Sequence, residues 1–244
     1  MADRAPPHPV RPPVAVIIPA LNEEAAIAKV VAAIPVDAAD AVIVVDNGSS
    51  DATAARARAA GATVQREALR GYGRACLTGI AHLPAETEIV VFLDGDFSDY
   101  PEDLPGLVAP IAAGRADMVI GSRVLGEREP GALLPQARLG NALATWLIRA
   151  IYGVAYTDLG PFRAIGRRAL AQLAMADIDY GWTVEMQVKA ARQGLRIEEV
   201  PVRYRRRVGQ SKVTGTLSGS IRAGYKILLT IFRHATSPTQ RPSA

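Results

Sequence analysis

Between Val14 and Arg123 the chain alternates short apolar runs with segments of helical character, and this alternation restricts its fold more than any other feature. The runs are rich in valine and isoleucine, as expected of strands that are buried on both faces of a parallel sheet. They cover residues 14–18, 41–45, 63–65, 90–93 and 117–121. Strands that alternate with helices in this way typically form one doubly wound sheet. We therefore predict an α/β fold with a mostly parallel, Rossmann-like sheet.

Polar residues directly follow most of the predicted strands. The clusters are Asn22-Glu23, residues 46–51, residues 94–99 and Ser122-Arg123. Because the carboxyl ends of parallel strands meet at one edge of a sheet, and ligands bind at that edge, we expect these clusters to form one site. Asn22 is also expected to cap a helix that runs to about Ile34, with Glu23 and Glu24 in its first turn.

The acidic stretch after the fourth strand contains Asp94, Asp96 and Asp99. Like charges this close repel one another, so a fold keeps them together when a cation lies between them. Oxygen ligands at a strand end suit Mg²⁺ or Mn²⁺ that also holds substrate phosphates. Gly95 allows the sharp turn that brings Asp94 and Asp96 to the same cavity. The alternative is a turn whose acidic side chains are simply solvated.

After residue 125 the alternation is less regular. Residues 126–135 form a loop containing glycine and proline that is long enough to act as a flap. Helices are predicted over residues 136–151 and 182–193, and one or two strands over residues 195–207. Residues 1–13 are proline-rich and are predicted to be a disordered arm, and residues 236–244 a frayed tail.

The basic residues are concentrated near the C-terminus. The chain has 28 Lys and Arg and 24 Asp and Glu, and residues 201–244 contain nine of the basic residues and none of the acidic ones. A basic end on an acidic body indicates a polyanionic partner, such as nucleic acid, anionic lipid or a phosphorylated substrate. Nucleic acid is not expected, because few aromatic residues lie among the basic ones.

Residues 217–232 have the pattern of an amphipathic helix. One predicted face carries Leu217, Ile221, Tyr225, Leu228 and Phe232, and another carries Arg222, Lys226 and Arg233. This pattern is typical of a helix that lies on an anionic membrane, and it also suits a helix packed on the sheet. No apolar run is long enough to span a bilayer and no signal peptide opens the chain, so we expect a cytoplasmic protein at the inner face of the membrane.

Several common cofactor motifs are absent from the sequence. The turn after the first strand reads Pro19-Ala20-Leu21-Asn22-Glu23, without the glycines of a nicotinamide-binding G-x-G-x-x-G turn. The P-loop pattern is missing as well, and the single cysteine, Cys76, excludes an internal disulfide. The sequence is compatible with a nucleotide that is held by carboxylates and a metal ion.

The motifs together resemble family 2 glycosyltransferases with the GT-A fold. The first segments are VIIPALNEE (residues 16–24), VVDNGSSD (residues 44–51) and Asp94-Gly95-Asp96. Gly121-Ser122-Arg123, residues 198–202 and residues 209–212 extend the match and look most like the dolichyl-phosphate mannose or glucose synthase branch. The resemblance covers residues 14–235 as one GT-A domain. It implies a nucleotide-binding half (14–125), an acceptor half (126–216) and an interfacial helix (217–235).

The resemblance also implies roles for individual residues. Those expected around the nucleotide are Pro19, Ala20, Leu21, Glu23, Asp46, Gly48, Ser49, Gly73, Asp94, Gly95 and Asp96. Asp94 and Asp96 are expected to bind the metal, and Arg123 and Lys212 to bind donor or acceptor phosphates. Asp158 is the candidate general base for an alcohol acceptor. Those expected near the acceptor are Glu185, Arg203, Arg205 and Ser211, although Asp158 and Glu185 also suit structural salt bridges, and residues 203–207 a solvated strand face.

Two positions depart from the family pattern. Asn47 stands where the second aspartate of Asp-Asp-Gly-Ser is usual, and Ser98 stands where the mannose synthases often have glutamine. The Gln-x-x-Arg-Trp motif of processive polymer synthases is missing.

We therefore expect an inverting, metal-dependent glycosyltransferase. Its donor would be a UDP- or GDP-sugar, and its acceptor a polyprenyl phosphate or another membrane lipid. A phosphate acceptor needs positioning rather than a base, because it is already anionic at neutral pH. The alternatives are the same donor chemistry with a soluble acceptor, and a non-catalytic nucleotide-sugar-binding protein. A dimer is left open.

Overall fold

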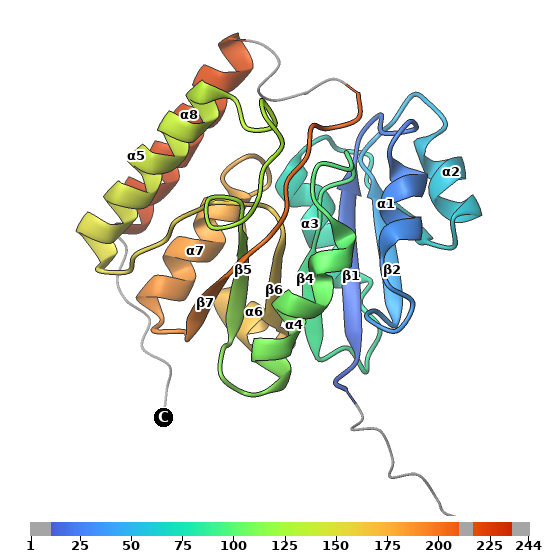
Figure 1. Ribbon diagram of the computed structural model, residues 1–244, viewed down its shortest axis with the longest axis horizontal. Helices are drawn as coiled ribbons and strands as arrows, with labels where there is room; N and C mark the ends of the chain where they lie inside the picture. The colour runs from blue at the N-terminus through green and yellow to red at the C-terminus, as the bar shows by residue number, and fades with distance from the viewer. Residues whose placement is uncertain (1–10, 210–216, 236–244) are drawn as a thin grey trace, which may run out of the picture.

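The computed structural model describes residues 11–209 and 217–235 of the chain (Figure 1). Most of the predicted N-terminal arm, the predicted tail, and the candidate residues Ser211 and Lys212 lie outside this part. Among the described residues, no helix is both long enough and apolar enough to cross a membrane.

One seven-stranded sheet organises the molecule, with the strand order β3-β2-β1-β4-β6-β5-β7. Its strands are β1 (Val14–Ala20), β2 (Ala41–Asp46), β3 (Thr63–Arg66), β4 (Ile89–Phe92), β5 (Met118–Ser122), β6 (Arg163–Gly166) and β7 (Ile197–Pro201). Strands β1 to β4 are parallel to one another, as are β5 and β7. Strand β6 is antiparallel to both of its neighbours, β4 and β5. The predicted mostly parallel α/β sheet is confirmed, and the antiparallel direction of β6 is the feature that the sequence did not reveal.

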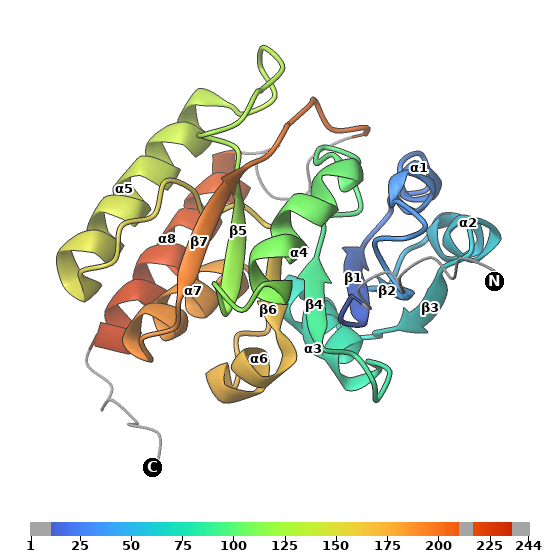
Figure 2. The same cartoon turned by 60° about the horizontal axis from the view of Figure 1, so that its bottom comes forward.

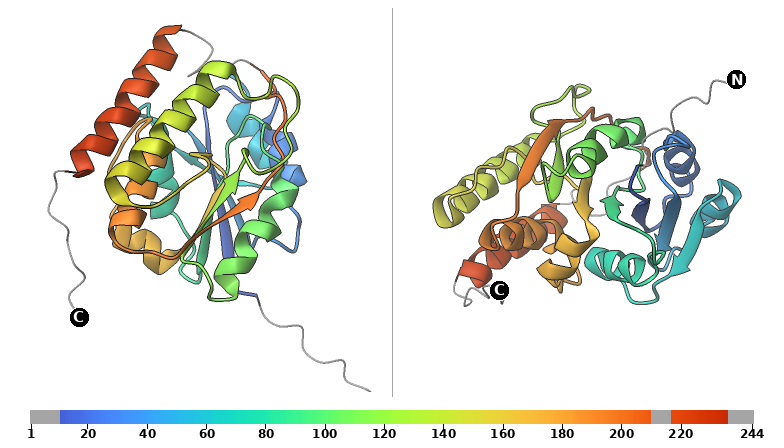
Figure 3. Two further views of the ribbon diagram at one scale, coloured as in Figure 1. Left: turned by 60° about the vertical axis from the view of Figure 1, so that its left-hand side comes forward. Right: turned by 90° about the horizontal axis from the view of Figure 1, so that it is seen from below.

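Helices cover both faces of the sheet (Figures 2 and 3). The helices are α1 (Ile27–Ala33), α2 (Thr53–Ala59), α3 (Tyr72–Ala81), α4 (Leu104–Ala112), α5 (Pro135–Tyr152), α6 (Arg167–Leu173), α7 (Trp182–Arg192) and α8 (Leu217–Ala235). Side chains of α1, α2 and α4 form one apolar core with one face of the sheet, and those of α3, α5, α6 and α7 form a second core with the other face. Successive residues of β1 alternate between the two cores, since Val16 and Ile18 belong to the first and Ile17 to the second.

The turn after β1 differs from the prediction. Helix α1 begins at Ile27, with Ala26 at its N-cap position, so Asn22 does not cap it and Glu23 and Glu24 lie before its first turn. Asn22 instead adopts a positive φ of 52°, a region that asparagine tolerates better than most residues. Its side-chain Oδ1 accepts a hydrogen bond from the backbone N–H of Ser50 (2.8 Å). The polar turn thus ties β1 to the segment that follows β2.

Helix α8 packs on α5 and α7 rather than on the sheet. Ile231 is fully buried and Thr230 nearly so, whereas Tyr225 is 67% exposed and Phe232 51% exposed. The helix therefore packs mainly through a face other than the predicted apolar one, on which Tyr225 and Phe232 are exposed and Leu228 is half-buried. The side chains of Leu217 and Ile221 lie outside the described part of the chain.

Candidate active site

The acidic turn after β4 forms the floor of a cavity at the carboxyl edge of the sheet. Asp94, Gly95 and Asp96 line this cavity, which measures about 690 Å³. A Cβ atom at residue 95 would lie 3.4 Å from the carbonyl oxygen of Pro19, an ordinary contact distance, so the turn lies against the end of β1 in an arrangement that does not depend on glycine. Of the four polar clusters predicted to converge, the turn after β1, the end of β2 and the acidic turn contribute to this cavity, and Ser122-Arg123 does not line it. Because this is where the nucleotide is expected, we refer to this cavity as the donor pocket.

The walls of the donor pocket come from distant parts of the chain. Its lining also includes Pro19, Ala20, Leu21, Asn22, Glu23, Asn47, Arg70, Gly71, Tyr72, Ala75, Asp179, Tyr180 and Arg207. All of the candidate nucleotide residues from the turn after β1 and from the acidic turn are among them. Asp46, Gly48, Ser49 and Gly73 lie beside the pocket and do not line it.

The candidates beside the pocket hold its walls together. The Asp46 Oδ1 accepts a hydrogen bond from the Ser49 N–H (3.0 Å), and the Ser49 Oγ accepts one from the Asn22 N–H (2.9 Å). A Cβ atom at Gly73 would overlap the carbonyl oxygen of Asp177, so this glycine allows α3 to pack against the loop before α7.

Asn47 uses both ends of its amide. Its Nδ2 donates to the carbonyl oxygen of Leu69 (2.8 Å), and its Oδ1 accepts from the N–H of Gly71 (2.8 Å). An ionised aspartate could accept the second bond but could not donate the first. The departure from the usual Asp-Asp pair therefore has a structural consequence, since Asn47 fixes the segment that leads to Tyr72.

Asp94 lies in a strongly perturbed environment. Burial and the neighbouring carboxylate of Asp96 raise the pKa of Asp94 to about 7, while the hydroxyl of Tyr72, which donates to its Oδ1 (3.0 Å), acts in the opposite direction. Burial also keeps the pKa of Tyr72 well above its ordinary value, so the phenol remains a donor. A cation between Asp94 and Asp96 would remove the repulsion that raises the pKa.

Asp96 is held by neighbours on both of its oxygens. Its Oδ1 accepts from the backbone N–H (2.9 Å) and the hydroxyl (2.5 Å) of Ser98. Its Oδ2 lies 3.1 Å from Nη2 of Arg207, and the same nitrogen lies 3.4 Å from Oε1 of Glu23. Ser98 therefore orients the carboxylate, at the position where the mannose synthases often have glutamine.

These residues suit a metal ion that is shared with a substrate. In the described part of the chain, no three Asp, Glu, His or Cys side chains cluster closely enough to enclose a metal by themselves. Mg²⁺ and Mn²⁺ that act on phosphates are commonly held by one or two carboxylates, with water and phosphate oxygens completing the shell. Asp94 and Asp96 supply such a pair at the floor of the donor pocket.

Asp99, the third carboxylate of the acidic stretch, points away from solvent. It is 1% exposed, and neither of its carboxylate oxygens has a hydrogen-bond partner among the described residues. Burial, reinforced by the charge of Asp94, keeps its pKa well above the ordinary value. The acidic stretch therefore divides into a pair that faces the donor pocket and a buried third member.

Arg123 and Asp158 form a bidentate ion pair near the pocket. Nε and Nη2 of Arg123 each donate to a different oxygen of Asp158 at 2.8 Å, and the Arg123 N–H donates as well (2.8 Å). Asp158 is fully buried. Because its oxygens are engaged by a guanidinium, the geometry favours the salt-bridge interpretation of Asp158 over a proton-accepting one.

Two further residues support this pair. The Glu199 carboxylate accepts from the N–H and the hydroxyl of Thr157 (2.9 and 3.0 Å) and from the N–H of Asp158 (3.2 Å). The guanidinium of Arg163, which is fully buried, donates to the carbonyl oxygens of Leu159 and Gly160. Burial lowers the pKa of Arg163 to about 10, so the residue remains charged near neutral pH.

The acceptor candidates that the structure describes, Glu185, Arg203 and Arg205, all contact other groups of the protein. Glu185 is buried, accepts from the N–H groups of Ala176 and Asp177 (3.1 and 2.7 Å), and pairs with Lys189 (2.8 Å). Arg203 pairs with Asp103 (2.6 Å). The guanidinium of Arg205 stacks on Phe97 and Tyr100, with its Cζ 3.4 and 3.9 Å from the ring centroids. None of the three lines the donor pocket.

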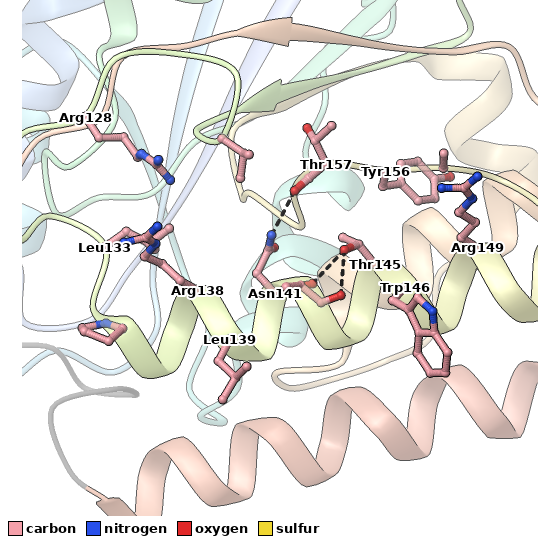
Figure 4. Close-up of a pocket in the computed structure, with 14 residues that line it drawn as sticks. Arg128, Leu133, Arg138, Leu139, Asn141, Thr145, Trp146, Arg149, Tyr156 and Thr157 are labelled. Atoms are coloured by element: carbon pink, nitrogen blue, oxygen red, sulfur yellow. Dashed lines mark hydrogen bonds between the residues drawn. The ribbon is translucent and has the colours of Figure 1, made fainter.

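A second cavity runs along α5, between this helix and the segments that carry Arg128 and Thr157 (Figure 4). This groove, which we call the α5 groove, measures about 820 Å³. Its polar residues include Arg128, Arg138 and Arg149, and its apolar residues include Leu139 and Trp146.

The α5 groove reaches the Arg123–Asp158 pair. Val124 and Thr157 line it, and each of them adjoins one member of that pair in the chain. Arg123 of this pair is also close enough to Asp94 of the donor pocket for its charge to lower the pKa of that carboxyl group.

Comparison with known proteins identifies the family. The sequence profile described as Glycosyl transferase family 2 matches residues 15–173, which is more than half of the chain. This chain belongs to glycosyltransferase family 2. Its sequence is 41% identical to that of an uncharacterized glycosyltransferase of Mycobacterium tuberculosis over 211 residues. The alignment covers 85% of this chain and 93% of the mycobacterial protein.

Two further relatives bear on the substrates. An undecaprenyl-phosphate mannosyltransferase of Micrococcus luteus is 33% identical over 194 residues, covering 73% of this chain and 77% of that protein. The glycosyltransferase also superposes on glucosyl-3-phosphoglycerate synthase of Mycobacterium tuberculosis with a TM-score of 0.74 and 26% identity, covering 94% of this chain and 82% of that chain. That enzyme was crystallised with Mn²⁺, UDP-glucose and phosphoglyceric acid. The expected family, fold and enzyme class are thus confirmed.

Sequence reasoning missed several pocket residues of this glycosyltransferase. Tyr72 and Asn47 are direct neighbours of predicted site residues, but their partners are 22 to 24 residues away. Asp179 and Tyr180 come from the loop before α7, where no motif marks them. Arg207 lies within a basic run, and nothing in the sequence distinguishes it from Arg205 or Arg206.

Proposed function

We propose that this glycosyltransferase transfers a sugar from a nucleoside diphosphate sugar to the phosphate of a membrane polyprenyl phosphate. The donor pocket supports the first part. It combines the Asp94–Asp96 pair with a cavity of about 690 Å³. A divalent metal bound there would stabilise the negative charge that develops on the departing diphosphate. Arg207 would add a positive charge on the same side of the cavity.

The α5 groove is the observation that carries the acceptor assignment. It combines an apolar lining with the guanidinium groups of Arg128, Arg138 and Arg149. Within the part of the chain that the structure describes, none of the three makes an ion pair. Guanidinium groups bind phosphate well, and apolar walls suit an isoprenoid chain. The groove therefore matches an acceptor with both features.

Exposed apolar side chains on α5 and α8 support a membrane acceptor. Leu139, Leu143 and Trp146 on α5 are 74%, 46% and 62% exposed, and their spacing places them on one side of the helix. Tyr225, Leu229 and Phe232 show the same spacing on α8 and are 67%, 45% and 51% exposed. The two helices lie side by side (Figures 1 and 3). Such residues next to arginines suit the interface of an anionic membrane.

With a phosphate acceptor, transfer of the sugar depends on positioning the two substrates rather than on removing a proton. The bond between the sugar C1 and the diphosphate oxygen breaks, its electron pair leaves with the nucleoside diphosphate, and an oxygen of the acceptor phosphate forms the new bond to C1. Because that oxygen is anionic at neutral pH, no residue has to remove a proton. Asp158 would hold Arg123 in place, and Arg123 would orient one of the phosphates.

A reconstituted assay tests the proposal. Purified protein, Mn²⁺ and vesicles containing undecaprenyl phosphate are incubated with radiolabelled UDP-glucose or GDP-mannose, and label is measured in the organic extract. We expect label in the extract that requires both Mn²⁺ and the lipid phosphate. We expect Arg138→Gln to lower the transfer roughly tenfold or more, as loss of a charged hydrogen bond implies. Arg58→Gln, at an exposed position on α2, serves as the control.

A soluble phosphorylated acceptor is the second candidate. The solved glucosyl-3-phosphoglycerate synthase, which was crystallised with phosphoglyceric acid, superposes over 94% of this chain. The same assay with 3-phosphoglycerate distinguishes the two, because its product stays in the aqueous phase. Transfer to 3-phosphoglycerate with none to the lipid would replace the lipid proposal.

Membrane contact has its own test. Trp146→Ser and Phe232→Ser are each expected to reduce co-flotation of the protein with phosphatidylglycerol vesicles. Val36→Ser is the matched control, because Val36 is 96% exposed in the segment between α1 and β2. Equal flotation of all variants would contradict the proposed surface.

A further inference from the structure

The segment after β7 runs alongside the acidic turn of the donor pocket. Residues 203–208, which we call the arginine strap, pair with that turn through backbone hydrogen bonds. The Arg205 N–H donates to the carbonyl oxygen of Ser98, and the Val208 N–H donates to that of Asp96, both at 2.9 Å. The strap is therefore fixed to the residues that carry the candidate metal ligands.

The arginines of the strap are directed to different partners. The Arg205 Nε donates to the carbonyl oxygen of Phe97 (2.8 Å), which anchors the strap from outside the pocket. The Arg206 Nε donates to the carbonyl oxygen of Pro130 (2.8 Å), in the loop between β5 and α5. Arg207 alone among the described strap residues lines the donor pocket.

Arg207 uses the oxygen of Asp96 that a metal ion would need. Ser98 already occupies Oδ1 of Asp96 with two hydrogen bonds, at 2.9 and 2.5 Å. Nη2 of Arg207 lies 3.1 Å from Oδ2. A guanidinium and a divalent cation on one carboxylate oxygen repel each other strongly at this range. Metal binding at Asp96 therefore requires the guanidinium of Arg207 to move.

We propose that Arg207 competes with the divalent metal for Asp96, and that a nucleoside diphosphate removes this competition by offering the guanidinium its own phosphate oxygens. The consequence is cooperative binding. The metal alone binds weakly, and diphosphate and metal each strengthen the binding of the other by the same factor. The metal is thereby loaded together with the donor. This inference concerns the donor pocket and holds for either acceptor.

Mn²⁺ titration of the full-length protein, with free Mn²⁺ measured by electron paramagnetic resonance, tests the competition directly. Without nucleotide, Arg207→Gln is expected to bind Mn²⁺ roughly five- to tenfold more tightly than the wild type, a change of about 1 kcal/mol or slightly more. Arg206→Gln removes a charge from the adjacent position of the strap and is expected to match the wild type. Mn²⁺ binding by Arg207→Gln that is no tighter than in the wild type would overturn the proposal.

A second titration measures the coupling. The measured quantity is the ratio of the Mn²⁺ affinity with saturating UDP or GDP to that without nucleotide. We expect this ratio to be large in the wild type and much smaller in Arg207→Gln. An unchanged ratio would also overturn the proposal. Arg207→Lys, which keeps the charge but lacks the planar fork, is expected to lie between the two. If Arg207→Gln shows no cooperative thermal transition and is therefore unfolded, Arg207→Lys replaces it in both titrations.

Discussion

Asp94 links the chemistry of the site to the stability of the protein. Its pKa of about 7 in the folded protein exceeds the ordinary value of 3.8, chiefly because of burial and then the charge of Asp96. A folded-state pKa above the unfolded one means that folding favours the protonated form. The stabilising contribution of Asp94 is therefore complete below about pH 4 and is lost as the pH rises through about 7.

A pair of unfolding curves tests this consequence. In the presence of EDTA, Asp94→Asn is expected to gain stability relative to the wild type as the pH rises from about 4 to 8. The melting temperatures of both proteins should be measured by circular dichroism at intervals of one pH unit. Adding Mn²⁺ together with UDP at pH 8 should raise the melting temperature of the wild type more than that of Asp94→Asn, because the metal binds the ionised wild-type carboxylate. A difference that does not vary with pH in EDTA would contradict the assigned environment, and exposed Asp37→Asn is the control.

The roles of individual charged side chains could not be predicted from the sequence alone. Asp158 and Glu185 were both identified as candidates, but their partners decide their roles. The Asp158 partner, Arg123, is 35 residues away, and Glu185 binds backbone groups eight and nine residues away. The i,i+4 pair of Glu185 with Lys189 is a local signal, but the other partners are not encoded locally, so the choice between a chemical role and ion pairing needed the fold.

At the scale of elements, the strands were predictable and some connections were not. Strands β1, β2 and β4 are continuous apolar runs, and their burial on both faces explains why the pattern is so clear. Helix α6 is a short helix of seven residues with only Leu170 and Leu173 buried, so it lacks a recognisable periodicity. The antiparallel direction of β6 depends on the irregular connection before it, which carries no directional signal.

The contact between α3 and the loop before α7 gives a prediction at this scale. At Gly73 an added Cβ would overlap the backbone of Asp177, and Asp179 and Tyr180 of the same loop line the donor pocket. Gly73→Ala should therefore lower stability by roughly 1–3 kcal/mol and weaken nucleotide binding as well. Chemical denaturation and nucleotide titration measure the two effects.

Gly106→Ala is the matched control for this change. Gly106 lies in α4, and a Cβ atom added there would meet no other atom within 4 Å, so alanine should stabilise the protein by roughly 0.5–1 kcal/mol. If Gly73→Ala were as stable as Gly106→Ala, the close approach of α3 to the loop would be wrong.

At the scale of the whole molecule, the two predicted halves of the chain, on either side of residue 125, share one sheet. Strand β5 belongs to the first half, yet its partners β6 and β7 both come from the second. The apolar core on one face likewise joins them, since Phe92 of β4 contacts Trp182 of α7 edge to face, with ring centroids 5.9 Å apart. The predicted division at residue 125 therefore does not separate folding units, and Asp179, Tyr180 and Arg207 from beyond it line the donor pocket.

A fragment ending at residue 125 should therefore fail to fold cooperatively. It would keep β1 to β4 but leave β5 without a partner strand, and it would expose the side of the sheet that α5, α6 and α7 cover. Unpaired strand edges and exposed apolar faces of this kind favour aggregation or a loosely packed state. We expect residues 11–125 to show no sharp thermal transition and to bind an apolar dye, whereas the full chain unfolds cooperatively without binding it. A fragment with a sharp transition and its own nucleotide affinity would mean that the first half is an autonomous domain, and that the acceptor half contributes only to closing the site.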